Sequence, residues 1–62
     1  MYFIKIVNDG LPNLYQDSRG IVMFDTYETA LNKALELKSA YLEEQGYPAI
    51  ISIMTLVTRY TV

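Results

Sequence analysis

The hydrophobic pattern at the start of the chain predicts a strand over residues 2–7. This run, YFIKIV, consists almost entirely of β-branched and aromatic residues, which favour strands. Side chains alternate between the two faces of a strand. One face therefore carries Tyr2, Ile4 and Ile6, and the other carries Phe3, Lys5 and Val7. Both faces are apolar apart from a single lysine.

A second strand is predicted over residues 21–24 (IVMF), connected to the first by a hairpin. Residues 8–10, Asn-Asp-Gly, end the first strand, and the Pro-Asn pair at 12–13 keeps the following segment irregular. Residues 14–15 (Leu-Tyr) are an alternative start for the second strand. Residues 17–20 (DSRG) are typical of a turn, since Asp and Ser suit its start and Gly its end.

A helix is predicted from residue 25 or 26 to about Gln45. Asp25 and Thr26 are both suitable caps, and Asp25 as the cap would make a capping box with Glu28. Gly46 is a suitable residue to end the helix, with a proline two positions beyond it.

The apolar side chains of this helix gather in one stripe when they are placed about 100° apart. The stripe consists of Tyr27, Ala30, Leu31, Ala34, Leu35, Tyr41 and Leu42, with Leu37 at its edge. Lys38 also falls within it. The lysine is either an anchor for a carboxylate of a partner or a side chain that snorkels at the edge of the sheet.

A third strand is predicted over residues 49–57 (AIISIMTLV), and residues 58–62 are either its extension or a frayed or bulged end. Its two faces are again apolar. One carries Ile51, Ile53, Thr55 and Val57, and the other carries Ile50, Ser52, Met54 and Leu56.

The predicted fold is therefore α+β, a single domain over residues 1–62. We expect a three-stranded antiparallel sheet with the connection β-β-α-β and the strand order 2-1-3, with one helix packed on one face. An antiparallel sheet with one wet face should alternate apolar and polar residues along its strands. Because these strands do not, we expect something else to cover the second face.

Composition excludes several kinds of site. The chain of 62 residues has no cysteine and no histidine, which removes disulfides, thiolate chemistry and the commonest catalytic base and metal ligand. The acidic residues fall in turns or on the solvent side of the helix, so paired carboxylates are not expected in a cleft. We therefore expect neither an enzyme nor a bound cofactor or metal.

Charge and hydropathy bear on partners and location. Five basic and seven acidic residues give a net charge of −2, which disfavours nucleic acid. No apolar stretch is long enough to span a membrane, and no signal peptide is present. Met1 leads directly into the first strand, as in a complete short reading frame. The default expectation is a cytoplasmic protein.

The residues predicted to form an interface are aromatic, apolar or basic side chains of the strands and turns. They are Tyr2, Phe3, Tyr15, Arg19, Ile50, Met54, Leu56, Arg59 and Tyr60. Tyrosine and arginine are enriched at protein interfaces, whereas Tyr27 and Tyr41 are assigned to the helix core.

Two alternative sites involve polar residues. A basic and aromatic sheet face that stacks nucleic-acid bases would use Lys5, Arg19 and Arg59 with Phe3 and Tyr60. A cation site would use Asn8, Asp9, Asn13 and Asp17, although ordinary turn chemistry also explains these four.

Residues 24–53, FDTYETALNKALELKSAYLEEQGYPAIISI, resemble a pattern frequent in very small phage proteins. In that pattern a strand, a Thr-led cap, "ETAL" or "EEAL" and an alanine-leucine helix precede a β-rich end. The similarity extends to the small early proteins with which lytic phages inhibit host RNA polymerase, where one helix packs on a three-stranded sheet. The resemblance implies a phage-encoded protein that binds a host protein. Arg19 and Arg59 match the arginine contacts of such inhibitors in type only, so no functional residue carries over.

Three functions are compatible with these patterns. The first is a non-enzymatic interaction protein from a phage or mobile element, which binds and modulates a host protein through its sheet face or edge. The second is a homodimeric assembly module, in which sheets stack or third strands pair across a two-fold axis. The third is a small nucleic-acid-binding module.

Overall fold

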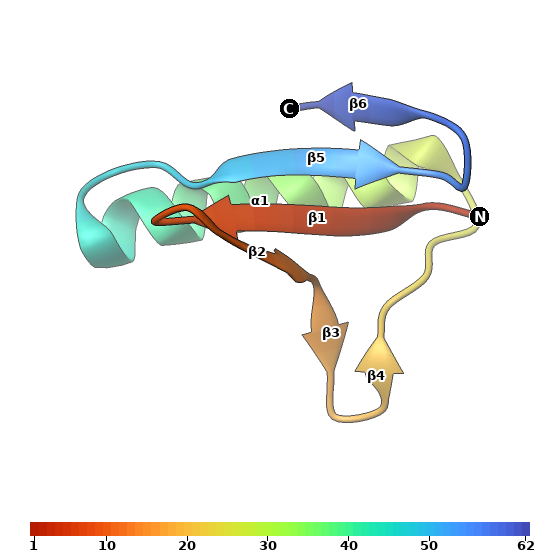
Figure 1. Ribbon diagram of the computed structural model, residues 1–62, viewed down its shortest axis with the longest axis horizontal. Helices are drawn as coiled ribbons and strands as arrows, with labels where there is room; N and C mark the ends of the chain where they lie inside the picture. Colours follow the sequence, from red (N-terminus) through yellow and green to blue (C-terminus); the bar gives the residue numbers. More distant parts are fainter.

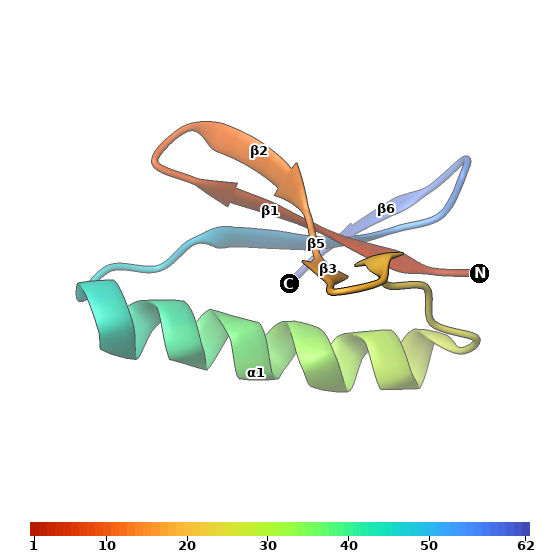
Figure 2. The same ribbon diagram turned by 90° about the horizontal axis from the view of Figure 1, so that it is seen from below.

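The computed structural model describes all 62 residues as one helix packed on an antiparallel sheet (Figure 1). The sheet has four strands in the order β2-β1-β5-β6, and β3 and β4 form a separate two-stranded ribbon. The strands are β1 (Phe3–Asn8), β2 (Leu11–Leu14), β3 (Gln16–Asp17), β4 (Gly20–Ile21), β5 (Ile50–Met54) and β6 (Arg59–Thr61). The helix α1 (Tyr27–Gln45) runs along one side of the sheet and leaves the other side uncovered (Figure 2).

The α+β class, the single helix and the central position of β1 between two antiparallel neighbours are confirmed. The sheet has four strands and not the three predicted, although the second strand, the first strand and the strand after the helix do lie in the predicted order 2-1-3. The neighbour of β1 is the segment Leu11–Leu14 rather than residues 21–24, and β6 adds a fourth strand.

The first hairpin is closed by the turn at Asp9 and Gly10. Both residues have positive φ, 54° and 77°, and the register pairs Asn8 with Leu11 across them. A two-residue turn of this kind matches the right-handed twist of the strands, and Asp-Gly is one of its preferred sequences. The segment predicted only to end β1 therefore also turns the chain directly into β2.

Residues 21–24 do not form the predicted second strand. Gly20 and Ile21 pair instead with Gln16 and Asp17, across the turn that the DSRG segment predicted. Only Phe24 reaches the central strand, where it exchanges two backbone hydrogen bonds with Tyr2, at 2.7 and 2.9 Å. The chain therefore leaves the edge of β1 after Tyr15, forms the β3–β4 ribbon and returns to the same edge at Phe24.

The predicted third strand ends at Met54 rather than at residue 57. The Thr55 N–H donates to the carbonyl of Thr58 at 2.7 Å, and the Thr58 N–H donates to Thr55 Oγ1 at 2.9 Å. These bonds close a hairpin that returns the chain as β6, antiparallel to β5. A local turn held by a threonine side chain thus replaces the long strand that the apolar run predicted.

The helix begins and ends close to the predicted residues. Thr26 is its cap, since its Oγ1 accepts from the Thr29 N–H at 3.2 Å, so the alternative capping box of Asp25 and Glu28 is not used. At the other end Gly46 has φ 80° and donates its N–H to the Leu42 carbonyl at 2.9 Å. A left-handed residue in this position is the usual end of an α-helix.

We predict that Gly46→Ala lowers the free energy of unfolding by about 1 kcal/mol, because alanine is strained at positive φ. An added Cβ would meet no atom within 4 Å, so the effect is conformational rather than steric. Thermal denaturation should show a melting temperature lower by about 4–8 °C. Ser39→Ala, at an exposed position of the same helix, is the control and should not lower it. An unchanged melting temperature for Gly46→Ala would contradict the left-handed helix end.

The core lies between α1 and the two central strands. Its buried side chains are Ile4, Ile6, Ala30, Ala34, Ala49, Ile51 and Ile53. The two buried helical alanines allow α1 to approach the sheet closely, and Leu31, Leu37 and Tyr41 pack beside them. The covered stripe is narrower than predicted, because Leu35 and Leu42 are each 50% exposed. Lys38 lies on the exposed surface and not under the sheet.

The helix does not combine the length and the apolarity needed to cross a membrane.

The C-terminal end of the helix is joined to the sheet by polar side chains. The side-chain amides of Asn8 and Gln45 exchange two hydrogen bonds, at 2.7 and 3.1 Å. This pair links the end of β1 to the end of α1.

Candidate protein-interaction surface

The side of the sheet that faces away from α1, the open face, follows from the strand register. Ile4 and Ile6 of β1 are buried under the helix, so their neighbours along the strand point the other way. The pairing of the strands then places ten residues on the open face: Phe3, Lys5, Val7, Pro12, Leu14, Ile50, Ser52, Met54, Arg59 and Thr61. Six of these side chains are apolar, counting the proline, and Ile50 is 60% exposed.

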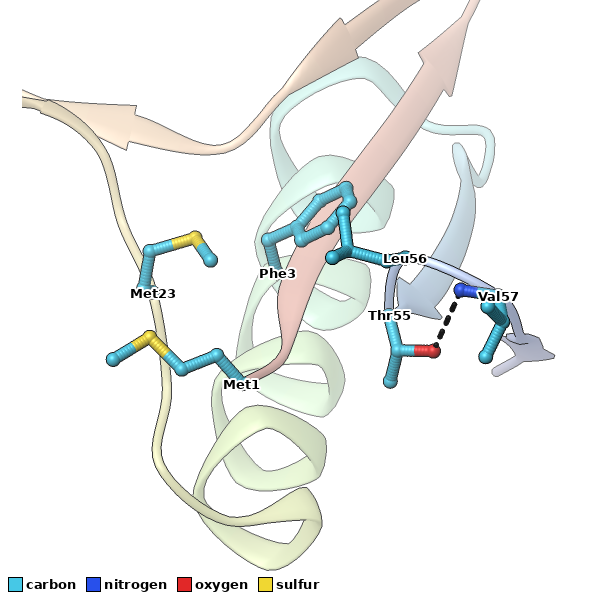
Figure 3. A pocket seen from close by; sticks show the side chains of 6 residues that line it. All are labelled: Met1, Phe3, Met23, Thr55, Leu56 and Val57. Atoms are coloured by element: carbon cyan, nitrogen blue, oxygen red, sulfur yellow. Dashed lines mark hydrogen bonds between the residues drawn. The ribbon is translucent and has the colours of Figure 1, made fainter.

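A groove of about 310 Å³ lies at one end of the open face, where β1 begins and β5 ends (Figure 3). It is lined by Met1, Phe3, Met23, Thr55, Leu56 and Val57. In Figure 3 the Phe3 ring and the Leu56 side chain lie side by side, and the side chains of Met1 and Met23 lie near each other on the other side of Phe3. Met23 comes from the segment after the β3–β4 ribbon. The groove therefore combines three parts of the chain that are distant in sequence.

The turn between β5 and β6 presents two apolar side chains to solvent. Leu56 is 97% exposed and Val57 is 93% exposed. Neither residue has positive φ, in contrast to Asp9 and Gly10 in the first hairpin. The turn is held by its flanking threonines, with the Val57 N–H also donating to Thr55 Oγ1 at 3.3 Å. The leucine and valine side chains therefore contribute little to the turn itself.

Charge is distributed unevenly around the sheet. The open face carries Lys5 and Arg59 and no carboxylate, and neither cation has an ion-pair partner. All seven carboxylates lie outside the four-stranded sheet, in the first hairpin turn, the β3–β4 ribbon, the helix or the segment before it: Asp9, Asp17, Asp25, Glu28, Glu36, Glu43 and Glu44. The open face is thus apolar and weakly cationic, although the chain as a whole is acidic.

The one ion pair lies on the helix, away from the open face. The Lys33 ammonium donates to Glu36 Oε1 at 3.3 Å, and this bond, together with the nearby Tyr15 ring, raises the pKa of Lys33. The ammonium also lies 5.7 Å from the centroid of the Tyr15 ring. Tyr15 is therefore engaged with the helix.

The structure separates the predicted interface residues into three groups. Phe3, Ile50, Met54 and Arg59 lie on the open face, with Leu56 at the tip of the adjoining turn. Tyr2, Tyr15 and Tyr60 lie on the helix side of the sheet. Arg19 lies in the turn of the β3–β4 ribbon, apart from both groups.

Three tyrosines form a cluster on the helix side, near the β6 edge. The rings of Tyr2 and Tyr27 are 6.0 Å apart, and those of Tyr27 and Tyr60 are 5.1 Å apart, both edge to face. Tyr27 and Tyr60 remain 37% and 43% exposed. The cluster therefore packs the start of the helix against the sheet. Part of its aromatic surface remains exposed to solvent.

Met1, Met23 and Val57 line the groove but are not among the interface residues that the sequence predicts. Met23 was assigned to a strand that does not form, and Met1 has no local pattern that marks it. Val57 was placed on the same face as the core isoleucines of a continuous strand. A signal was available for the turn, since threonines at positions 55 and 58 are suited to side-chain bonds with the backbone.

The four polar residues considered for a cation site are bonded within the protein. Asn13 Oδ1 accepts from the Leu14 N–H at 2.9 Å, and Asp17 Oδ1 accepts from the Arg19 N–H at 2.8 Å. The Tyr47 hydroxyl donates to Asp9 at 2.9 Å, which raises the pKa of Tyr47. No group of three or more acidic side chains is placed to hold a metal ion. These hydrogen bonds, together with those between the side-chain amides of Asn8 and Gln45, account for all four residues.

Comparison with known proteins finds no matching family model, no similar curated protein and no similar solved structure.

Proposed function

We propose that this chain is a non-enzymatic protein-binding module that engages another protein through its open face and the Leu56–Val57 turn. The observation that carries the proposal is the near-complete exposure of both turn residues, 97% and 93%. Turns in general favour Gly, Pro, Asn, Asp and Ser, and large apolar side chains bring no benefit to the turn itself. Burial of each against a partner is worth about 1.5–3 kcal/mol.

The groove beside this turn supports the same function. Its volume of about 310 Å³ is large enough for one or two inserted side chains and is at the lower end of the range for small-molecule pockets. Two of its lining residues are methionines, whose flexible side chains adapt to a bound surface. The partner we propose is therefore a protein with a protruding apolar side chain.

The partner's origin rests on the sequence. The resemblance of residues 24–53 to early phage proteins favours a phage-encoded chain that acts in the host cytoplasm and modulates a host protein. Binding of nucleic acid is disfavoured, because the open face carries only Lys5 and Arg59 for phosphate contacts.

The test is to exchange the turn for one that folds well but presents no apolar surface. Leu56→Asn with Val57→Gly removes both apolar side chains. Asparagine and glycine are common turn residues and also adopt the negative φ found here, so the melting temperature should stay within a few degrees of the wild type. A photo-crosslinking amino acid at Ile50, which is 60% exposed on the open face, should capture a discrete host protein from bacterial lysate. We expect this capture to fall at least tenfold in the Asn-Gly variant.

Two matched controls define the result. Leu42→Asn removes a half-exposed apolar side chain from the helix and should leave capture unchanged. The same crosslinker at Glu43 should capture nothing specific. Equal capture by the wild type and the Asn-Gly variant, with both folded, would contradict a role for the turn.

A further inference from the structure

The two edges of the sheet differ in their free backbone donors. In β2 the hydrogen-bonded pairs alternate, and the Tyr15 N–H donates to the Ile4 carbonyl at 2.8 Å. By that alternation the backbone nitrogens of Pro12 and Leu14 point away from β1. Proline has no N–H, and the Leu14 N–H is bonded to Asn13 Oδ1 at 2.9 Å. The β2 edge therefore presents no free donor within the strand at the positions where another strand would pair.

The β6 edge lacks any such protection. The Val62 N–H donates to the Ile51 carbonyl at 2.9 Å, which fixes the alternation along this strand. The N–H and C=O groups of Arg59 and Thr61 consequently point away from β5. No side chain bonds to them, and β6 contains no proline or acidic residue. Unlike β2, β6 has only its short length and the Arg59 charge to discourage pairing, so its outward backbone groups remain available to another strand.

We propose that the β6 edge pairs with the β6 edge of a second copy of this chain. The antiparallel register that uses both free residues places Tyr60 on a two-fold axis. Arg59 of each copy then exchanges both backbone bonds with Thr61 of the other. The two sheets of four strands join into one of eight, with both helices on one side and both open faces on the other.

Three features favour a second copy over an unrelated extended segment. The protected β2 edges become the outer edges of the joined sheet, so assembly closes at two copies rather than continuing as a fibre. Arg59, the only charged residue of β6, lies opposite Thr61 and not opposite its own counterpart. Tyr60, 43% exposed, comes to lie beside the same residue of the second copy, and aromatic pairs across strands are favourable. The dimer uses the edge and not the groove, so it is independent of the proposed function.

The test uses a proline at an outward-pointing position. Thr61→Pro removes the outward donor and leaves the bonds of β6 with β5 in place, because its nitrogen does not face β5. Thr61→Ala removes the same side chain and keeps the donor. We expect the wild type and Thr61→Ala to form dimers in sedimentation experiments from about 20 µM to about 1 mM, and Thr61→Pro to weaken dimerisation at least tenfold.

Hydrogen exchange gives a second, residue-level measurement. The Arg59 and Thr61 amides should exchange several-fold more slowly at high concentration than at low concentration, whereas the core amides of β1 and β5 should not change. A chain with N-methylated Thr61, made by synthesis, replaces Thr61→Pro if the latter does not fold. A monomeric wild type at about 1 mM with fast exchange at both amides would overturn the proposal. A dimer lost in the Leu56→Asn, Val57→Gly variant would also overturn it, because it would place the contact at the groove.

Discussion

Ile53→Lys is expected to abolish folding, whereas Met54→Lys at the next position should leave the fold intact. Ile53 is 0% exposed and lies between Ile4 and Tyr60 under the helix. A lysine there either buries a charge or forces the helix off the sheet, at a cost of at least about 3–5 kcal/mol. A domain of this size has a total stability of about 3–9 kcal/mol. The substitution therefore removes most or all of the free energy of unfolding.

Met54 faces the other side of the sheet, where its row consists of Phe3 and Arg59. A lysine at this position can extend its ammonium into water while its stem covers the same surface. We expect a circular dichroism spectrum like that of the wild type and a melting temperature within a few degrees of it. Capture of the proposed partner should fall, because a charge replaces an apolar side chain beside the groove.

The pair of variants needs one control for the loss of volume alone. Ile53→Val keeps the core apolar and should cost only about 0.5–1.5 kcal/mol, so it should fold cooperatively. Circular dichroism and amide dispersion in NMR spectra distinguish the three cases. If Met54→Lys unfolds and Ile53→Lys does not, the assignment of the helix to the Ile4–Ile53 side is wrong.

Pro12→Val combined with Asn13→Val is expected to make the protein assemble without limit. The two changes restore an N–H at position 12 and release the Leu14 N–H from Asn13. Neither removes a bond between β2 and β1, because the nitrogen of residue 12 points outward and valine keeps the backbone N–H of residue 13. Both edges of the sheet are then open, and a chain with two open edges can add copies at each end.

Light scattering and thioflavin fluorescence would measure this assembly over days at about 100 µM, a concentration at which exposed strand edges promote aggregation. Each single variant leaves one position protected and should assemble far more slowly than the pair. Asn32→Val adds the same apolar side chain to the exposed side of the helix and should remain soluble. Solubility equal to that of the wild type in the double variant would show that Pro12 and Asn13 do not protect the edge.

A third change links this result to the β6 edge. Adding Thr61→Pro to the double variant closes β6 and leaves only β2 open. The expected product is a closed dimer paired through β2, because a single open edge cannot propagate. Continued fibre growth in the triple variant would mean that assembly uses a surface other than the two edges.

The types of residue in the candidate site could be predicted from the sequence, but their positions in the fold could not. The apolar character of both faces of β1 and β5 is visible in the sequence, and five of the nine selected residues do lie on or beside the open face. Tyr2, Tyr15 and Tyr60 belong to the opposite side. The side of the sheet on which these tyrosines lie depends on the strand register and on which face the helix covers. Neither can be read from a short window of residues.

The sequence alone determined those features whose causes are local. The helix from Tyr27 to Gln45 follows from its period, a threonine cap and a glycine end, all within one segment. The Asp9–Gly10 turn and the DSRG turn have the same local origin, although the first was interpreted only as the end of a strand.

Only the tertiary structure decided which apolar face became the core, because both faces of β1 and β5 are largely apolar and one helix covers only one of them. It also decided that Met1, Phe3, Met23 and Leu56 meet in one groove. That meeting depends on contacts between distant segments, such as the Tyr2–Phe24 bridge, and on the β5–β6 turn that ends the long apolar run. Packing, rather than the preference of any single residue, selects among such arrangements.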